Sequence, residues 1–324
     1  MHSAEELLDI INKALASENF KKQPEELYKP VEYILSLGGK RLRPVLLMMA
    51  CEMFGGDIKR AIPAALGVEM FHNFSLVHDD IMDRAPLRRG KPTVHEKWNA
   101  NIAILSGDTM LTMAYDFFLR LEGVDHRLAL EVFGNTAREV CEGQQIDMNF
   151  ETRENISPDE YFKMIRLKTA VLIGASLKIG GISANAGIDD LDRLYESGIV
   201  SGLQFQLIDD LLDTYGDEKV FGKMHSGDIT ANKKTILYVD AMLTAGEQDR
   251  QRLSCLYSGK VTDIENKIYE VKAIFDRLGV KELVEKRIRD LHLQSRNIMD
   301  SISVDPEKKK ILIDYTEKLL ERKN

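Results

Sequence analysis

Residues 61–83 read AIPAALGVEMFHNFSLVHDDIMD, an apolar stretch that ends in the acidic sequence DDIMD. Its large apolar side chains recur every three or four residues, at Ile62, Leu66, Met70, Phe74, Val77 and Ile81. This spacing is typical of one face of an α-helix. The stretch therefore predicts a long, buried helix that carries carboxylates at its C-terminal end.

The same spacing recurs along most of the chain, and only 8 of the 324 residues are proline. No stretch alternates apolar and polar residues as a strand does, and no hairpin signal is present. The pattern predicts helices over residues 4–16, 24–37, 44–54, 61–83, 94–98, 101–121, 127–150, 158–182, 188–215, 232–245 and, with breaks, 262–322. Because no low-complexity linker divides the chain, we expect one all-α domain that spans residues 1–324.

Composition narrows the functional classes. Hydrophobic residues make up 44% of the chain and charged residues 30%, which provides a substantial core. The net charge of −8 argues against a nucleic-acid partner, because no dominant basic field exists. No apolar run reaches about 18 uncharged residues, so we expect no integral membrane segment.

The three cysteines, Cys51, Cys141 and Cys255, lie far apart in apolar sequence contexts and form no CxxC pair. Disulfides are rare in reducing compartments. We therefore expect buried, reduced thiols and a cytoplasmic protein. The N-terminal residues are acidic and amphipathic, unlike a secretory signal.

The acidic sequence is present twice, because residues 209–213 read DDLLD after another apolar stretch. Side chains four residues apart share one helix face, so Asp79 with Asp83, and Asp209 with Asp213, should each present two carboxylates together. Such carboxylates repel one another. Mg²⁺ reverses this repulsion, since it combines a few carboxylates with water and substrate phosphate oxygens. The pair of motifs predicts a metal-bridged diphosphate held between two helices; either motif alone could be a solvated acidic helix end.

Two basic segments could bind the same anion. Residues 38–44, GGKRLRP, combine flexible glycines with three cations beside a helix N-terminus. Residues 84–93, RAPLRRGKPT, follow the first acidic motif directly, and arginine binds phosphate with two parallel hydrogen bonds. Each segment also has a structural interpretation. The first could be a glycine helix cap with solvated bases, and the second could compensate the charge of the aspartates.

Weaker candidates surround these motifs. His72 lies two turns before Asp79 on the same helix face, and it is either a core histidine or a donor to an anionic ligand. Gln144 and Asp147 are one turn apart and could reach the same cavity. His78 adjoins the aspartates but points elsewhere, so we expect it to be structural.

Three lysines complete the candidates. Lys168 lies in the middle of a predicted helix beside Thr169, where a charge before an apolar run hints at a ligand. Lys223 and Lys233 flank the loop that follows the second acidic motif, and each could equally be a surface lysine. No Ser-His-Asp system and no Rossmann or P-loop glycine pattern is present in the sequence.

The chain resembles the trans-isoprenyl diphosphate synthases, or polyprenyl synthetases, in a series of motifs that follow one another in order. These are GGKRLRP, HDDIMD with RRG, the Lys168-Thr169 pair, and FQLIDDLLD with GK, GDI and NKK. The resemblance extends over about residues 30–240. It implies an isoprenoid-synthase-type helical bundle around a deep central cavity, usually as a homodimer. It also implies head-to-tail condensation of isopentenyl diphosphate with an allylic diphosphate.

The resemblance further implies roles for individual residues. Three Mg²⁺ ions, with Mn²⁺ as a possible substitute, would be bound by Asp79, Asp83 and Asp209, with support from Asp80, Asp210 and Asp213. The allylic diphosphate would be gripped by Arg88, Lys168, Lys223 and Lys233. Isopentenyl diphosphate would be bound by Lys40, Arg43, His72 and Arg89, with Arg41 close by. The reacting carbons would be lined by Thr169 and Gln206.

Elementary chemistry agrees with these roles. An allylic C–O bond ionises when metal ions and fixed cations stabilise the negative charge of the departing diphosphate. The double bond of isopentenyl diphosphate then attacks the carbocation, and a proton is lost. No protein base stands out in the sequence, so the diphosphate is a plausible acceptor. Water would quench the cation, which explains an apolar cavity beneath a charged mouth.

Product length is partly readable from the residues before the first acidic motif. Phe74 and Phe71 lie five and eight residues before Asp79, or about 7.5 and 12 Å along a helix. In the family, bulk near these positions forms the floor of the elongation pocket. Phe74 followed by the small Ser75 resembles short-chain enzymes and favours a geranylgeranyl (C20) product over a farnesyl (C15) product. Phe71 could instead be a plain core residue.

Two other functions remain open. A class I terpene synthase shares the first acidic motif and the ionisation step, but such enzymes typically carry a different second metal motif and lack the bases that bind isopentenyl diphosphate. A non-catalytic partner subunit of another prenyl synthase usually loses an aspartate motif, and both are intact in this sequence.

Overall fold

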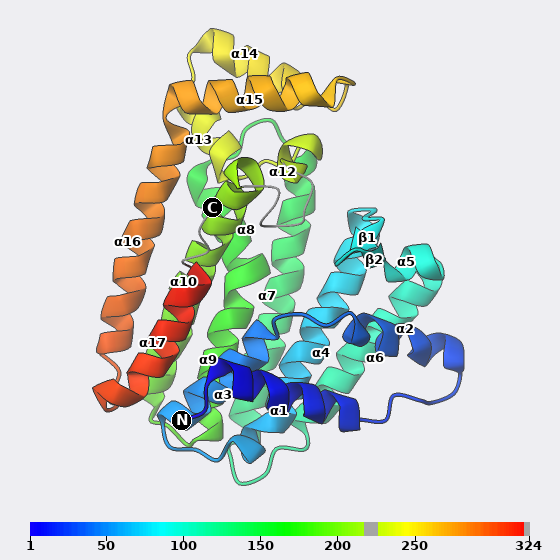
Figure 1. The fold of residues 1–324 in the computed structure, drawn as a ribbon, viewed down its shortest axis with the longest axis vertical. Coiled ribbons are helices and arrows are strands. Elements are labelled where there is room, and N and C mark those ends of the chain that lie inside the picture. The colour runs from blue at the N-terminus through cyan, green and yellow to red at the C-terminus, as the bar shows by residue number, and fades with distance from the viewer. Residues whose placement is uncertain (217–225, 321–324) are drawn as a thin grey trace. The chain divides into compact units, whose positions relative to one another are not determined.

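A computed structural model describes residues 1–216 and 226–320 of the chain. The chain forms two compact units. The first comprises Met1–Ala137, Ala175–Tyr195 and Ile302–Leu312, and the second comprises Arg138–Gly174, Glu196–Ser301 and the residues from Ile313 onward. Four helices contribute residues to both units (Figure 1): α7 (His126–Thr152), α9 (Val171–Ser183), α10 (Ile188–Tyr215) and α17 (Pro306–Leu320).

The elements that belong to the first unit alone are α1 (Ala4–Ser17), α2 (Glu25–Ser36), α3 (Leu42–Met53), α4 (Ile58–Met82), β1 (Leu87–Arg88), β2 (Lys91–Pro92), α5 (Val94–Lys97) and α6 (Ala100–Phe118). Those of the second unit are α8 (Pro158–Ile165), a π-helical turn η1 (Arg166–Ala170), α12 (Gly227–Thr230), α13 (Ile236–Thr244), α14 (Glu247–Leu256), α15 (Ile264–Leu278) and α16 (Val280–Asp300). The prediction of an all-α fold is confirmed. Within the described ranges, no helix is both long and apolar enough to cross a membrane.

Helix α4 is the main element of the first unit and ends in the first acidic motif. Its N-cap is Asp57, whose side chain accepts a hydrogen bond from the backbone N–H of Lys59. It packs extensively against α6. Gly67 permits this close approach, because a Cβ there would lie 2.8 Å from the ring of Phe118. The buried helix therefore holds the aspartates at its end in a fixed position.

The sequence predicts no hairpin, and this prediction is wrong for residues 87–92. Leu87 pairs with Pro92, and Arg88 with Lys91, in a two-stranded antiparallel ladder. The turn residues Arg89 and Gly90 have φ values of 53° and 73°, as a tight hairpin turn requires. Strands of two residues are too short to show an alternating pattern, which explains why the sequence does not reveal them.

The predicted helix over residues 158–182 is interrupted by the π-helical turn η1, which contains Lys168 and Thr169. π-helical turns within α-helices occur frequently at functional sites. Gly143 of α7 packs directly against this turn. A Cβ on Gly143 would lie 2.3 Å from the backbone nitrogen of Lys168, so the contact requires glycine.

The expectation of three buried cysteines is only partly correct. None of the three forms a disulfide, and Cys51 is buried, with the pKa of its thiol raised by burial to about 12. Cys141 and Cys255 are exposed instead. Polar and charged residues stand close to both: Glu139 and Glu142 around Cys141, and Arg252 and Ser254 before Cys255. Their sequence contexts are therefore less apolar than expected.

We predict that Gly143→Ala destabilises the protein by about 1–3 kcal/mol, because the added methyl group meets backbone that cannot move independently. The matched control is Gly134→Ala on the same helix, where the nearest atom to a new Cβ is the Tyr115 hydroxyl at 3.7 Å. That control should be neutral or stabilising, since alanine is the better helix former. Urea denaturation of both variants checks this, and equal stabilities would contradict it.

Candidate active site

The three aspartates of the first acidic motif differ in their surroundings. Asp80 is buried, and both of its carboxylate oxygens accept hydrogen bonds from Arg88, at 2.8 Å from Nε and 2.8 Å from Nη2. Burial raises the pKa of Asp80, and the Arg88 guanidinium opposes that rise. Asp79 is partly exposed and Asp83 is exposed, one helical turn apart. The middle carboxylate is thus anchored in the protein, and the outer two aspartates are more exposed.

The hairpin that follows α4 positions Arg88. The backbone N–H of Ala85 donates to the carbonyl of Asp80 at 2.9 Å, and the hydroxyl of Thr93 donates to the carbonyl of Ala85 at 2.8 Å. These bonds fold residues 84–93 back toward the end of α4. Arg88 therefore forms a bidentate ion pair, as the sequence prediction of charge compensation allows, and its side chain remains partly exposed.

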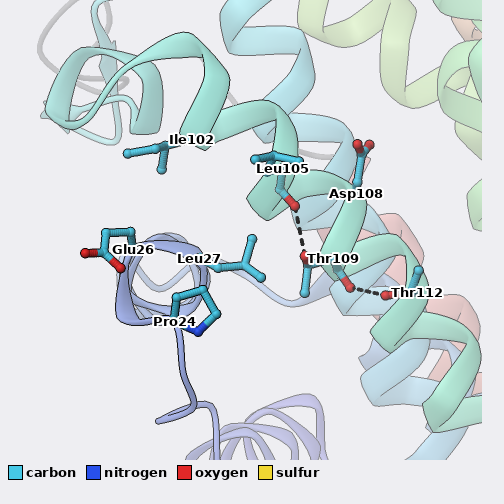
Figure 2. Close-up of a pocket in the computed structure, with 8 residues that line it drawn as sticks. All are labelled: Pro24, Glu26, Leu27, Ile102, Leu105, Asp108, Thr109 and Thr112. Atoms are coloured by element: carbon cyan, nitrogen blue, oxygen red, sulfur yellow. Dashed lines mark hydrogen bonds between the residues drawn. The ribbon is translucent and has the colours of Figure 1, made fainter.

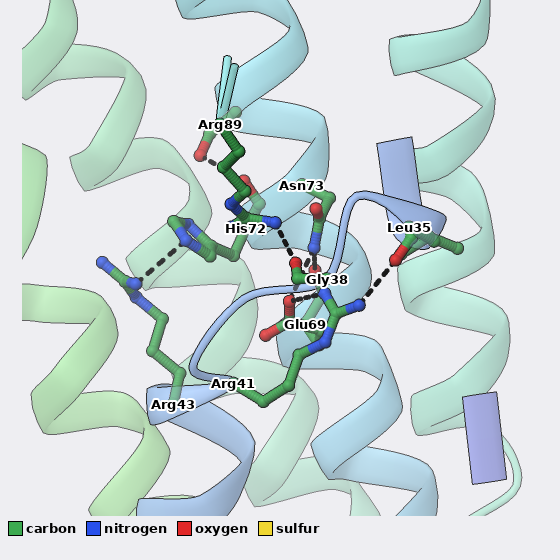
Figure 3. A network of polar contacts seen from close by, with 9 residues as sticks. Leu35, Gly38, Arg41, Arg43, Glu69, His72, Asn73 and Arg89 are labelled. Carbon is green, nitrogen blue, oxygen red and sulfur yellow. Dashed lines mark hydrogen bonds and ion pairs between the residues drawn. The ribbon is translucent and has the colours of Figure 1, made fainter. Parts of the chain in front are cut away.

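The first basic segment adopts an open loop between α2 and α3. Gly38 and Gly39 have φ values of 75° and 131°, which glycine adopts without strain. Arg89 donates a hydrogen bond to the carbonyl of Gly38, and Lys40 is exposed beside it. Figure 3 shows Arg89 reaching this loop from the hairpin. Both basic segments therefore meet in one place, as the prediction of a shared anion site requires.

His72 lies within this basic cluster. Its Nε2 lies 3.1 Å from Nη1 of Arg43, and because a guanidinium only donates, Nε2 is the acceptor. Burial, followed by the charge of Arg43, lowers the pKa of His72 well below its usual value. Burial also lowers the pKa of Arg43 to about 10, so Arg43 remains a cation at neutral pH. The neutral ring then carries its proton on Nδ1, which can donate to an anion.

Arg41 is placed differently from the other bases of this segment. Its guanidinium is buried and lies 2.6 Å from a carboxylate oxygen of Glu69 and 2.6 Å from the carbonyl oxygen of Leu35 (Figure 3). The resemblance implies only that Arg41 is close to the substrate. The structure places it beneath the loop, where positioning suits it better than direct contact.

An aromatic cluster lies along α4, one to two turns before the first acidic motif. Phe71 is fully buried against Phe133, with ring centroids 5.4 Å apart. Phe74 packs on Phe71 at 5.5 Å and on His78 at 4.7 Å. His78 is fixed by a hydrogen bond to the carbonyl oxygen of Ile104, which agrees with its expected structural role. Phe74 is thus packed between Phe71 and His78, in tilted and edge-to-face contacts.

The second acidic motif borders a cavity of about 230 Å³ within the second unit. Polar side chains dominate its lining. The lining residues are Asp147, Tyr161, Met164, Ile165, Lys168, Thr169, Gln206, Asp209, Asp210, Asp228, Lys233, Lys234 and Thr235. The cavity therefore gathers Lys168, Thr169, Gln206 and Lys233, four residues that the sequence assigns to one site. Lys223 lies outside the described residues.

Asp210 connects several elements around this cavity. Its carboxylate accepts hydrogen bonds from the hydroxyl of Tyr161, from Nε2 of Gln206 at 3.0 Å and from the backbone N–H of Ile236 at 3.3 Å. Burial, followed by the charge of Asp228, raises the pKa of Asp210 to about 7. Like Asp80, the middle aspartate of this motif is engaged by the protein, while Asp209 is partly exposed.

Asp213 contacts Asp228, one of the residues that line the cavity. A carboxylate oxygen of Asp213 accepts a hydrogen bond from the backbone N–H of Asp228 at 2.8 Å. The carbonyl of Asp213 also accepts a bond from the N–H of Ser226 at 2.9 Å. Sequence reasoning assigned no role to Asp228 or Tyr161. The GDI motif contains Asp228 and could have indicated it, whereas nothing in the sequence distinguishes Tyr161.

The π-helical turn presents Lys168 and Thr169 to the cavity. Nζ of Lys168 lies 2.5 Å from a carboxylate oxygen of Asp147, one of the weaker sequence candidates. The hydroxyl of Thr169 donates to Oε1 of Gln206 at 3.1 Å, which continues the network to Asp210. The next lysine after Lys233, Lys234, donates to the carbonyl of Phe150 at 2.8 Å and so fixes the loop that carries Lys233.

Backbone strain concentrates at these loops. Among the described residues, six non-glycine positions have positive φ, namely Arg41, Arg84, Arg89, Asn185, Ser226 and Asn232. Three belong to the basic segments and two flank the loop after the second acidic motif. Such conformations cost about 1–3 kcal/mol each and tend to cluster at functional sites.

The donor set fits Mg²⁺. In the described parts of the chain, no three His, Cys, Asp or Glu side chains converge into a ready-made metal cage. Mg²⁺ commonly binds through one or two carboxylates together with substrate phosphates and water. Asp79 and Asp209 are partly exposed and Asp83 is exposed, which suits this mode of binding.

A separate groove of about 390 Å³ lies between the start of α2 and one face of α6 (Figure 2). Pro24, Leu27, Ile102 and Leu105 make its lining largely apolar. Thr109 and Thr112 bond their hydroxyls to carbonyls of their own helix. None of the residues predicted from the acidic or basic motifs lines this groove.

Comparison with known proteins assigns the chain to a family. The polyprenyl synthetase family model matches residues 24–275, and the chain belongs to this family. It is 42% identical over 221 residues to the geranylgeranyl diphosphate synthase of Methanosarcina mazei, which covers 68% of each chain. It is 38% identical over 288 residues to the short chain isoprenyl diphosphate synthase of Methanothermobacter thermautotrophicus, which covers 86% of this chain and 87% of that protein.

The fold comparison agrees. A crystal structure of geranylgeranyl pyrophosphate synthase superposes with a TM-score of 0.94 and 42% sequence identity, over 100% of both chains. The resemblance drawn from the sequence motifs is therefore confirmed at the level of the family and of the all-α fold.

The lowered pKa of His72 predicts a pH-dependent stability. Below pH about 6.5 the unfolded chain binds a proton at this residue that the folded chain does not, so the stability that neutral His72 contributes is lost as pH falls. His72→Gln keeps an acceptor for Arg43 and removes the titration. From pH about 7 to 5, wild type should lose more unfolding free energy than the variant, by up to about 1.4 kcal/mol per pH unit. Parallel curves from denaturant titrations would contradict this.

Proposed function

We propose that the chain catalyses the Mg²⁺-dependent head-to-tail condensation of isopentenyl diphosphate with allylic diphosphates. The product is a short-chain trans-prenyl diphosphate of C15–C20, with geranylgeranyl favoured. Membership of the polyprenyl synthetase family makes the chain a prenyltransferase, and its relatives are named as geranylgeranyl and short chain isoprenyl diphosphate synthases. The observation that carries the proposal is the presence of two acidic motifs, each with a buried middle carboxylate held by the protein (Asp80 and Asp210) and a partly exposed first aspartate (Asp79 and Asp209).

Members of the family are generally Mg²⁺-dependent. We propose three ions per active site, held by Asp79, Asp83 and Asp209, with Mn²⁺ able to substitute because it also prefers oxygen ligands. The chemistry that the ions supply is stabilisation of the negative charge that develops on the leaving diphosphate. Asp80, Asp210 and Asp213 support this arrangement through the hydrogen bonds described above.

The cations divide between the two substrates. Arg88, Lys168, Lys223 and Lys233 bind the allylic diphosphate. Lys40, Arg43, His72 and Arg89 bind isopentenyl diphosphate, where neutral His72 donates from Nδ1 and the arginines supply charge. Thr169 and Gln206, joined by a hydrogen bond, line the reacting carbons. Fixed donors of this kind need no reorganisation as the charge develops.

The proposal also covers the domain organisation, the oligomeric state and the partners of the protein. We propose that residues 1–324 act as one polyprenyl synthetase domain and that the protein works as a homodimer, with no nucleic-acid partner. Light scattering during size-exclusion chromatography would test the homodimer, and a mass equal to one chain would refute it. The cytoplasmic location stays a prediction from the cysteine content.

Product analysis tests the reaction directly. Purified protein is incubated with Mg²⁺, isopentenyl diphosphate and dimethylallyl, geranyl or farnesyl diphosphate, and the dephosphorylated alcohols are resolved by length. A dominant C15 or C20 alcohol supports the proposal and decides between the two lengths. Cyclic hydrocarbons formed from an allylic diphosphate alone would indicate a class I terpene synthase. No turnover with any starter, together with stimulation of another synthase, would indicate a partner subunit.

We predict that Asp79→Asn and Asp209→Asn each lower kcat by about 10²-fold or more, because each removes a charge that binds a catalytic metal ion. The control is Asp189→Asn, which makes the same change at an exposed position near the start of α10. This control should alter kcat less than about twofold, since an exposed charge in a first helical turn is worth only about 0.3–1 kcal/mol of stability. Equal losses in all three variants would refute the metal-binding role.

We predict that Phe74→Ala shifts the product beyond C20, because it removes the ring that packs between Phe71 and His78 on α4. Phe275→Ala on α15 removes another buried ring, which is 0% exposed against 7% for Phe74, from the core of the second unit. It should cost a comparable stability of about 3–5 kcal/mol and leave product length unchanged. Chromatography of the alcohols checks this prediction. An unchanged product from Phe74→Ala would refute the assignment of Phe74 to the floor of the elongation pocket.

A further inference from the structure

A buried ion pair lies beneath the basic loop of the first unit. Arg41 is 6% exposed and Glu69 is 2% exposed, and their charged groups lie 2.6 Å apart. Asn73, which is fully buried, donates through Nδ2 to the same carboxylate at 2.7 Å and to the Glu69 carbonyl at 2.8 Å. A buried pair contributes little stability unless further hydrogen bonds satisfy it. This pair is not fully satisfied, because Arg41 Nε and Asn73 Oδ1 are buried without a hydrogen-bond partner among the described residues, so stability alone does not account for it.

Arg41 connects three parts of the unit, as Figure 3 shows. Its side chain bonds Glu69 on α4 and the carbonyl of Leu35 near the end of α2. Its backbone is the N-cap of α3 in the left-handed conformation, with φ 44° and ψ 40°. That conformation costs a residue with a side chain about 1–2 kcal/mol. The two side-chain bonds hold Arg41 in it.

The path of the loop determines where the cations lie. Lys40 directly precedes Arg41, and Arg43 is in the first turn of the helix that Arg41 caps. The guanidinium of Arg89 lies against Gly39, where a Cβ would come within 2.7 Å of it, and it bonds the Gly38 carbonyl. A shift of Arg41 would therefore move Lys40, Arg43 and the partner backbone of Arg89 together.

We propose that Glu69 is a positioning residue for isopentenyl diphosphate, acting through Arg41 on the basic loop and never touching the substrate. This inference rests on the proposed function and names a residue beyond those assigned to it. The proposed role of Glu69 is the opposite of what its charge alone would suggest. A carboxylate near a diphosphate site should weaken anion binding, so its removal should improve affinity if charge alone mattered.

The test is Glu69→Gln, which keeps the shape and leaves Arg41 buried without its counter-charge. We expect KM for isopentenyl diphosphate to rise about tenfold or more, because breaking a buried charge pair is strongly unfavourable. KM for geranyl diphosphate, and kcat at saturating isopentenyl diphosphate, should stay within about threefold, as expected for a defect in binding one substrate. An unchanged or lower KM for isopentenyl diphosphate in the variant would overturn the positioning role.

Asp240→Asn is the matched control. Asp240 is fully buried and pairs with Arg287 at 2.8 Å, between α13 and α16 of the second unit. It should lower stability as much as Glu69→Gln without raising KM for isopentenyl diphosphate. A similar rise in KM in both variants would show that general destabilisation is the cause, and would overturn the proposal.

Two further measurements keep the proposal testable if Glu69→Gln folds poorly. Asn73→Ala removes one hydrogen bond to Glu69, and we expect a rise in KM for isopentenyl diphosphate of about threefold from a loss of this size. In a double-mutant cycle, Arg41→Gln should add little to the KM effect of Glu69→Gln, because both act through one contact. Full additivity would overturn the proposal. Absence of turnover by wild type would refute the proposed function as well, and this is measured first.

Discussion

Repulsion between carboxylates crowded onto helix ends is the constraint on which the rest of this structure depends. Helices α4 and α10 each carry three aspartates within five residues, and in each the middle carboxylate is withdrawn into the protein. Asp80 is held by the guanidinium of Arg88, and Asp210 by Tyr161, Gln206 and the first turn of α13. Asp79 and Asp209 are partly exposed and Asp83 is exposed, whereas Asp213 accepts a hydrogen bond from the backbone N–H of Asp228. Divalent cations and a diphosphate can relieve their repulsion, which links the fold to the proposed reaction.

Repulsion also acts between the basic side chains of the two basic segments. Crowded cations in the first unit are accommodated by a neutral histidine and a buried carboxylate. His72 accepts a hydrogen bond from Arg43, and burial, followed by the surrounding positive charge, lowers the pKa of its ring. Glu69 neutralises Arg41 beneath the loop. The cations are therefore supported by interior partners, and Glu69 holds the side chain of Arg41, whose backbone has a positive φ of 44°.

The sequence predicted most of the helices because their periodicity is local, although it missed α12 (Gly227–Thr230) and α14 (Glu247–Leu256). Spacing also placed Asp79 and Asp83 one helical turn apart, as the structure shows. The sequence did not predict the hairpin at residues 87–92, whose strands are too short to alternate, or the π-helical turn at Lys168, which depends on the close approach of Gly143. The roles of Glu69, Tyr161 and Asp228 as partners of the site residues were also not predicted from the sequence. Their roles arise from contacts between distant segments, and a single buried acid or tyrosine carries no local signature.

The most direct test of this account measures whether metal and diphosphate bind together. The melting temperature of the purified protein is recorded with a thio analogue of farnesyl diphosphate that cannot ionise, in Mg²⁺ and in EDTA. The account predicts clear stabilisation only when both are present, by about 2.7 kcal/mol at a ligand concentration one hundred times Kd. Mg²⁺ alone should have little effect. Equal stabilisation by the analogue in EDTA would contradict the claim that the carboxylates of the two acidic motifs bind the allylic diphosphate through metal ions.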